Sequence, residues 1–97
     1  MVYVDALMDW GWRLGVSCHM LPHDHTDLAL EELHQFAERI GMKRAWFQDK
    51  SAWLHYDLTA SKRALAVKAG AVEVTSKQYI LRMRDDPTFN LRRRARR

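Results

Sequence analysis

The chain has 97 residues, of which 47% are hydrophobic and 29% charged, and its formal net charge is +4. This length predicts one domain, and this composition excludes a disordered chain. The single cysteine excludes an internal disulfide, and no apolar run approaches the roughly 18 residues of a membrane-spanning helix. The N-terminal segment lacks the basic and apolar parts of a signal peptide, so we expect a cytoplasmic protein without membrane contact.

The positive charge is concentrated at the C-terminus. The last six residues contain five arginines, which are Arg92, Arg93, Arg94, Arg96 and Arg97. Removing these five from the 16 Lys and Arg leaves 11 against 12 Asp and Glu, so the rest of the chain carries a formal charge of −1. We therefore predict a domain over residues 1–86 and a basic, flexible tail over residues 87–97. The tail either binds nucleic-acid phosphates without sequence specificity or is a solvated end.

The first half of the chain alternates between strand and helix patterns. Val2 to Asp5 is a short β-prone run, and Val16 to Met20 alternates between inward and outward positions as a half-buried strand does. Thr26 or Asp27 is suited to cap the helix that follows. The apolar residues of that helix recur at helical spacing and end at the stop signal Gly41; they are Leu30, Leu33, Phe36, Ala37 and Ile40.

The second half continues this alternation. Residues 43–48 and 53–58 predict two strands that pair as a hairpin, the second with clear two-residue alternation. The remaining predicted elements are a helix over residues 60–69 capped by Thr59, a strand over residues 71–75, and a helix over residues 77–85 capped by Ser76 and ended by Pro87. Strands that alternate with helices predict a single small α/β domain with a small mixed sheet and about three helices.

The segment His55-Tyr56-Asp57 is the strongest candidate for chemistry. Its spacing places His55 and Asp57 on one face of a strand, and we expect both at the carboxyl end of that strand, where ligands bind in α/β folds. An alternative is that the two side chains only pair with each other, or with Arg44, on a solvated face.

The helix that follows this segment starts with an electrostatic conflict. Its first turn contains Ser61, Lys62 and Arg63. Positive side chains are unfavourable at a helix N-terminus unless an anion is bound there. We therefore predict a phosphate-binding site over residues 59–63; the alternative is that these cations only increase solubility.

Two further histidines extend the candidate site. His19 lies on the outward face of its predicted strand, and His34 lies at the edge of the apolar stripe of its helix. If the strands of His19 and His55 are neighbours, three imidazoles and the Asp57 carboxylate converge, which is a set able to hold Zn²⁺ or to perform acid–base chemistry. The spacing matches no recognised zinc motif, so we assign neither a metal nor a cofactor.

Several short motifs occur together in an order that resembles a known family. They are Val2-Tyr3-Val4-Asp5, His19-Met20, Glu32-Leu33-His34-Gln35-Phe36-Ala37, Ile40-Gly41, Phe47-Gln48, His55-Tyr56-Asp57-Leu58, Gly70-Ala71 and Thr75-Ser76. Over residues 2–82 the chain is similar to an uncharacterised family of small bacterial and phage proteins with a His-Tyr-Asp motif. The resemblance implies a shared fold and no established reaction. The Trp10-Gly11-Trp12 segment, residues 49–54 and the arginine tail depart from the family pattern.

Three functions are compatible with these features. The first is a module that binds a phosphorylated ligand, a nucleotide or a nucleic-acid phosphate, at the His, Asp, Lys and Arg cluster. The second is a phosphodiester or nucleotide hydrolase that uses histidine acid–base chemistry. The third is a phage inhibitor that binds a host protein through the Trp10–Trp12 segment and the arginine tail. A homo-oligomer is compatible with all three, since so short a chain gains buried surface by pairing.

Overall fold

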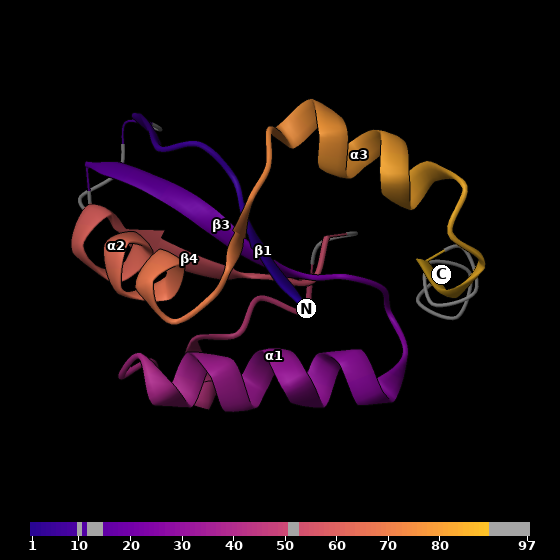
Figure 1. Ribbon diagram of the computed structural model, residues 1–97, viewed down its shortest axis with the longest axis horizontal. Coiled ribbons are helices and arrows are strands. Elements are labelled where there is room, and N and C mark those ends of the chain that lie inside the picture. The colour runs from indigo at the N-terminus through magenta and orange to yellow at the C-terminus, as the bar shows by residue number, and fades with distance from the viewer. Residues whose placement is uncertain (10, 12–14, 51–52, 90–97) are drawn as a thin grey trace.

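A computed structural model describes residues 1–9, 11, 15–50 and 53–89 (Figure 1). Over this part the chain forms a single small α/β domain with a mixed sheet and three helices, which confirms the predicted fold class. Trp10, Trp12 and the five tail arginines lie outside the described residues. In the described part, none of the helices is both long enough and apolar enough to cross a membrane.

The sheet is built around one central strand. Strand β3 (Val16–Pro22) pairs antiparallel with β1 (Val2–Val4), β2 (Met8–Asp9) and β4 (Tyr56–Thr59). Strand β5 (Val72–Glu73) then pairs with β1 in parallel. The strands therefore form one mixed sheet in which β3 has neighbours on both sides.

Each helix begins at a threonine that satisfies a free backbone N–H group. Thr26 caps α1 (Asp27–Arg39), and Thr59 caps α2 (Ala60–Lys68). Helix α3 (Ser76–Arg84) is capped by Thr75 and not by Ser76 as predicted, because Thr75 and Gln78 form a reciprocal capping box. Ser76 is thus the first residue of the helix, and its hydroxyl is used elsewhere.

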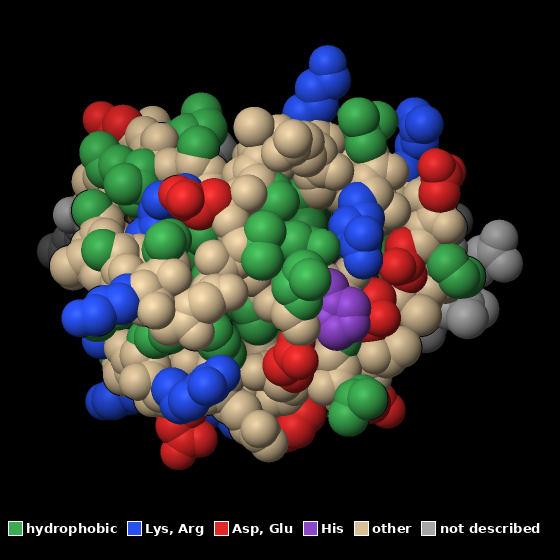
Figure 2. Space-filling model, in the orientation of Figure 1, with side chains coloured by type: hydrophobic (Ala, Val, Ile, Leu, Met, Phe, Trp, Pro, Cys, Tyr) green, Lys and Arg blue, Asp and Glu red, His purple; other side chains and the backbone are tan. Residues whose placement is uncertain are grey.

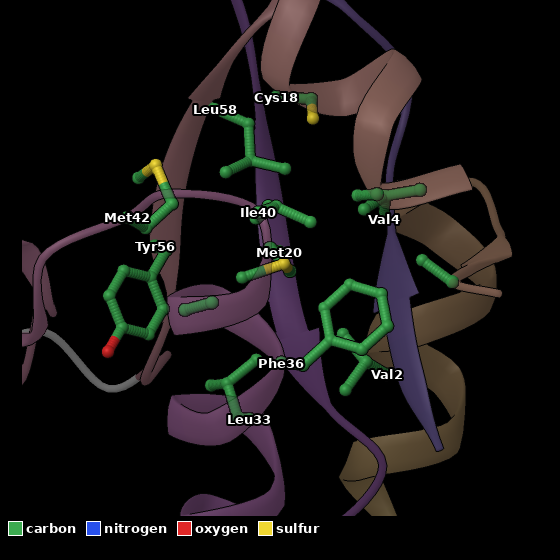
Figure 3. Close-up of a cluster of buried hydrophobic side chains, with 13 residues drawn as sticks. Val2, Val4, Cys18, Met20, Leu33, Phe36, Ile40, Met42, Tyr56 and Leu58 are labelled. Atoms are coloured by element: carbon green, nitrogen blue, oxygen red, sulfur yellow. The ribbon is translucent and has the colours of Figure 1, made fainter. Parts of the chain in front are cut away.

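The sheet has a buried core on each face. Helices α1 and α2 cover one face and α3 covers part of the other, and Figure 1 shows α1 and α3 on opposite sides of β1 and β3. The larger core contains the labelled side chains of Figure 3, which are Val2, Val4, Cys18, Met20, Leu33, Phe36, Ile40, Met42, Tyr56 and Leu58. The smaller core contains Tyr3, Leu21, Tyr79, Met83 and Phe89. The five apolar residues predicted to form the stripe of α1 are all buried.

The prediction of a strand over residues 43–48 is wrong. Arg44–Trp46 form a 3-10 helix instead, with hydrogen bonds from Trp46 N to Lys43 O (2.9 Å) and from Phe47 N to Arg44 O (3.1 Å). The predicted hairpin is reduced to an isolated bridge between Gln48 and His55. These local hydrogen bonds satisfy backbone groups that a strand partner would otherwise have to satisfy.

A glycine contact at the end of α1 gives a stability test. Gly41 has φ +83°, and a Cβ there would lie 2.7 Å from Lys62 Nζ, which donates to Ile40 O at 2.7 Å. We predict that Gly41→Ala lowers the free energy of unfolding by about 2 kcal/mol, because backbone strain adds to the loss of that hydrogen bond.

Gly15→Ala is the matched control for this substitution. Gly15 has φ +68°, and within the described part of the chain a Cβ there meets no atom within 4 Å. We expect it to cost only the strain, about 1 kcal/mol. Urea denaturation measures both variants, and equal losses would contradict the role of Lys62.

Candidate functional site

Polar side chains form a row across three neighbouring strands of the sheet. His19 on β3 lies opposite Asp57 on β4, and on the other side of β3 the backbone N–H of Asp5 donates to His19 O at 3.1 Å. His55 precedes Asp57 by two residues and lies on the same face. The row lies on the face that α3 partly covers, since the residues alternating with it belong to the larger core.

Asp5 is the most buried member of this row, with an exposed fraction of 3%. Its Oδ1 accepts from the backbone N–H of His19 at 2.6 Å. Its Oδ2 accepts from His19 Nδ1 at 2.7 Å and from the Ser76 hydroxyl at 3.1 Å. Burial opposes ionisation, but these hydrogen bonds and the nearby imidazole hold the pKa of Asp5 below its usual value, so it is a carboxylate.

The same contact fixes the ring of His19. Because an ionised carboxylate only accepts hydrogen bonds, His19 Nδ1 carries the proton and donates it to Asp5. This hydrogen bond raises the pKa of His19, although burial acts in the opposite direction. The orientation of the imidazole is therefore set by a residue on the neighbouring strand.

His55 and Asp57 form the second pair. His55 Nδ1 donates to the carbonyl oxygen of Trp53 at 2.5 Å, and His55 Nε2 lies 3.3 Å from Asp57 Oδ1. Asp57 Oδ1 is buried and has no hydrogen-bond partner among the described residues. The rings of His19 and His55 meet edge to face with centroids 4.8 Å apart, so the two pairs form one cluster.

A cavity of about 360 Å³ lies beside this cluster, between the sheet and α3. Its lining residues are Asp5, His19, Leu21, Trp53, His55, Ser76, Tyr79 and Ile80. The apolar and aromatic residues form the walls, while the histidines, Asp5 and Ser76 are its polar members. This division is typical of sites that hold a small ligand.

The phosphate site predicted over residues 59–63, at the start of α2, has its cations paired with acceptors of the protein. Lys62 Nζ donates to Ile40 O at 2.7 Å, and Arg63 donates to Asp5 O at 2.9 Å and to Glu73 Oε1 at 3.0 Å. Ser61 Oγ lies 3.2 Å from Thr59 Oγ1. These cations therefore bind acceptors of the protein, and they do not line the cavity beside His19 and His55.

Two predicted positions need correction. His55 and Asp57 do not lie at the carboxyl end of their strand, because β4 begins at Tyr56 and ends at Thr59. His34 does not join the other histidines. It lies on the opposite face of the sheet, where its Nδ1 is 2.7 Å from the Tyr56 hydroxyl. Of the three predicted imidazoles, the structure brings together His19 and His55.

Sequence analysis missed Asp5 and Ser76 as site residues. A carboxylate that directly follows a β-prone run was the available signal for Asp5. For Ser76 the signal was the capping box of Thr75 and Gln78, which leaves the serine hydroxyl available for another contact. Cys18 is buried in the larger core, and burial raises the pKa of its thiol to about 12, so it is not a nucleophile at neutral pH.

Fold and site together define a small α/β domain with a histidine–carboxylate cluster beside a mostly apolar cavity. The sequence model of one family, described as Protein of unknown function (DUF4031), matches residues 2–86. The chain belongs to this family, which confirms the predicted membership of a family without an established function. No curated protein and no solved structure matches the chain.

The hydrogen bonds of Asp5 give the test of this site's architecture. We predict that Asp5→Asn lowers the free energy of unfolding by about 2–4 kcal/mol, because an amide places donors where the carboxylate oxygens accept hydrogen bonds. Asp85→Asn is the control, since that side chain is 83% exposed, and we expect a change within about 0.5 kcal/mol. Thermal or urea unfolding measures both, and a stable Asp5→Asn variant would show that the network contributes little.

Proposed function

We propose that this protein binds a small phosphorylated ligand in the cavity between the sheet and α3. The observation that carries the proposal is the placement of the His19–His55 cluster beside a cavity whose walls are otherwise mostly apolar. A ligand with a ring at one end and a charged group at the other is complementary to such a site.

The walls favour an aromatic ring such as a nucleobase. Trp53 and Tyr79 line the cavity and contact each other edge to face, with ring centroids 5.8 Å apart. Aromatic side chains stack on bases without requiring a particular base. The volume of about 360 Å³ lies at the lower end of the range for small-ligand sites, which suits a mononucleotide better than a larger cofactor.

The donors for a phosphate group come from the start of α3, because the protons of His19 Nδ1, His55 Nδ1 and Ser76 Oγ are already donated to acceptors of the protein. The imidazoles of His19 and His55 and the hydroxyl of Ser76 line the same cavity. Ser76 is also the first residue of α3, where backbone N–H groups and the helix dipole favour negative charge. The carboxylates of Asp5 and Asp57 oppose a bare anion at short range, so a compensating cation strengthens the binding of a phosphate.

A nucleotide or phosphodiester hydrolase is the second candidate. It is favoured by the two imidazole–carboxylate pairs, since a carboxylate that orients an imidazole is a recurring arrangement for general acid–base catalysis. A binding module returns its ligand unchanged, whereas a hydrolase converts it.

The proposed ligand site is tested at the rim of the cavity. Ile80 and Leu81 are neighbours on α3 and are 48% and 47% exposed, but only Ile80 lines the cavity. We predict that Ile80→Asp weakens binding of a nucleoside monophosphate about tenfold or more by charge repulsion, while Leu81→Asp leaves it unchanged. Calorimetric titration of both variants and of the wild type measures this. Equal effects of the two substitutions, or no binding by the wild type, would refute the site.

The second candidate is tested by turnover. Incubation with labelled mononucleotides and a short RNA, with Mg²⁺ or Zn²⁺ added, is followed by chromatography. A hydrolase gives products at a rate that His55→Gln reduces about a hundredfold or more. Intact ligand after prolonged incubation, together with measurable binding, leaves the binding module as the function.

A further inference from the structure

We propose that His19, His55 and Asp57 together hold one divalent transition-metal ion of the Zn²⁺ class. Each residue offers one ligand atom, and these atoms lie within 4.8 Å of one another. Two imidazoles and one carboxylate leave a fourth position for water or ligand, which is the composition of an open metal site. The side chains are only partly exposed, at 26% for His19, 12% for His55 and 19% for Asp57, so the ion would be shielded but reachable.

The distances suit such an ion. With metal–ligand bonds of about 2.0–2.1 Å, the ligand atoms of a tetrahedral site are roughly 3.4 Å apart. His55 Nε2 and Asp57 Oδ1 are already 3.3 Å apart. The longest separation in the cluster, up to 4.8 Å, has to shorten by roughly 1.4 Å to reach the tetrahedral value, a change within the reach of small side-chain rotations.

The hydrogen bond of His55 Nδ1 and the position of the Asp57 carboxylate point to a cation between these two residues. Its Nδ1 is the donor to the Trp53 carbonyl oxygen, which leaves Nε2 as the nitrogen that can offer a lone pair to a metal ion. His55 Nε2 lies 3.3 Å from Asp57 Oδ1, which is buried and has no hydrogen-bond partner among the described residues. Two acceptors at this distance repel each other unless a proton or a metal ion lies between them, and a metal ion uses both lone pairs.

Asp5 fits the role of a positioning residue for this site. Its Oδ2 accepts a hydrogen bond from His19 Nδ1 at 2.7 Å, which leaves His19 Nε2 as the nitrogen that coordinates the metal ion. A carboxylate hydrogen-bonded to the second nitrogen of a histidine ligand recurs in zinc sites, where it fixes the ring and increases its basicity. The carbonyl oxygen of Trp53 does the same for His55.

The ion also supplies positive charge in this cavity, which favours binding of the proposed phosphorylated ligand. A divalent cation compensates the carboxylates of Asp5 and Asp57 and can take a phosphate oxygen as its fourth ligand. This last step rests on the proposed function, whereas the three-residue metal site does not.

The test is metal binding by the full chain, prepared without a histidine tag and freed of metal by chelator dialysis. We expect one Zn²⁺ per chain in a competition titration against a chelating dye. Asp57→Asn keeps the shape of the side chain and should weaken Zn²⁺ binding about a hundredfold, and Asp5→Asn about tenfold. His23→Gln is the control, because His23 has acidic neighbours but lies outside the cluster, and it should bind as the wild type does.

The wild-type chain provides a second measurement that needs no substitution. Added Zn²⁺ should shift the imidazole NMR signals of His19 and His55 and leave those of His34 in place. Substoichiometric Zn²⁺, wild-type affinity in Asp57→Asn, or shifts confined to other histidines overturns the site.

Titration of a mononucleotide with and without Zn²⁺ separates the two proposals. Zn²⁺ binding without any nucleotide binding supports the metal site and refutes the proposed ligand. Nucleotide binding that is unchanged in excess chelator, by a chain that takes up no Zn²⁺, supports the ligand site and refutes the metal site.

Discussion

The position of the buried Asp5 carboxylate is the constraint on which the site depends. This carboxylate accepts hydrogen bonds from the backbone and ring of His19 on β3 and from Ser76 at the start of α3. The backbone carbonyl oxygen of Asp5 accepts a hydrogen bond from Arg63 of α2. A buried carboxylate without such donors would be strongly unfavourable. One residue at the end of β1 therefore links a strand and two helices, and it orients the imidazole that faces the cavity.

The cationic start of α2 shows how a local conflict is resolved by tertiary structure. Considered within its own helix, Lys62 is unfavourable beside the helix N-terminus. Its ammonium group reaches the carbonyl oxygen of Ile40 at the end of α1, where the dipole of that helix favours positive charge. Arg63 reaches Asp5 O and Glu73 in the same way. No external anion is needed to explain either cation, and Figure 2 shows basic and acidic side chains on the same face of the molecule.

The features predicted correctly from the sequence are the ones with local causes. The buried stripe of α1, the caps Thr26 and Thr59 and the alternation through Tyr56 follow from spacing and side-chain type. The prediction of a strand over residues 43–48 was wrong because a short apolar run is compatible with a strand or a helix. In the structure, local hydrogen bonds make Arg44–Trp46 a 3-10 helix. The spacing of Thr75 and Gln78 is the sequence pattern of a capping box. This pattern indicates that Thr75, and not Ser76, is the N-cap of α3.

The site required information that no local pattern contains. Alternation placed His55 and Asp57 on one face and His19 on the outward face of its strand, but it could not show which strands are neighbours or in what register. Pairing of β3 with both β1 and β4 places one carboxylate on each side of His19, Asp5 on one and Asp57 on the other. The two carboxylates add negative charge beside the imidazoles at this end of the cavity. The electrostatics therefore favour a bound cation, and such a cation in turn favours an anionic ligand.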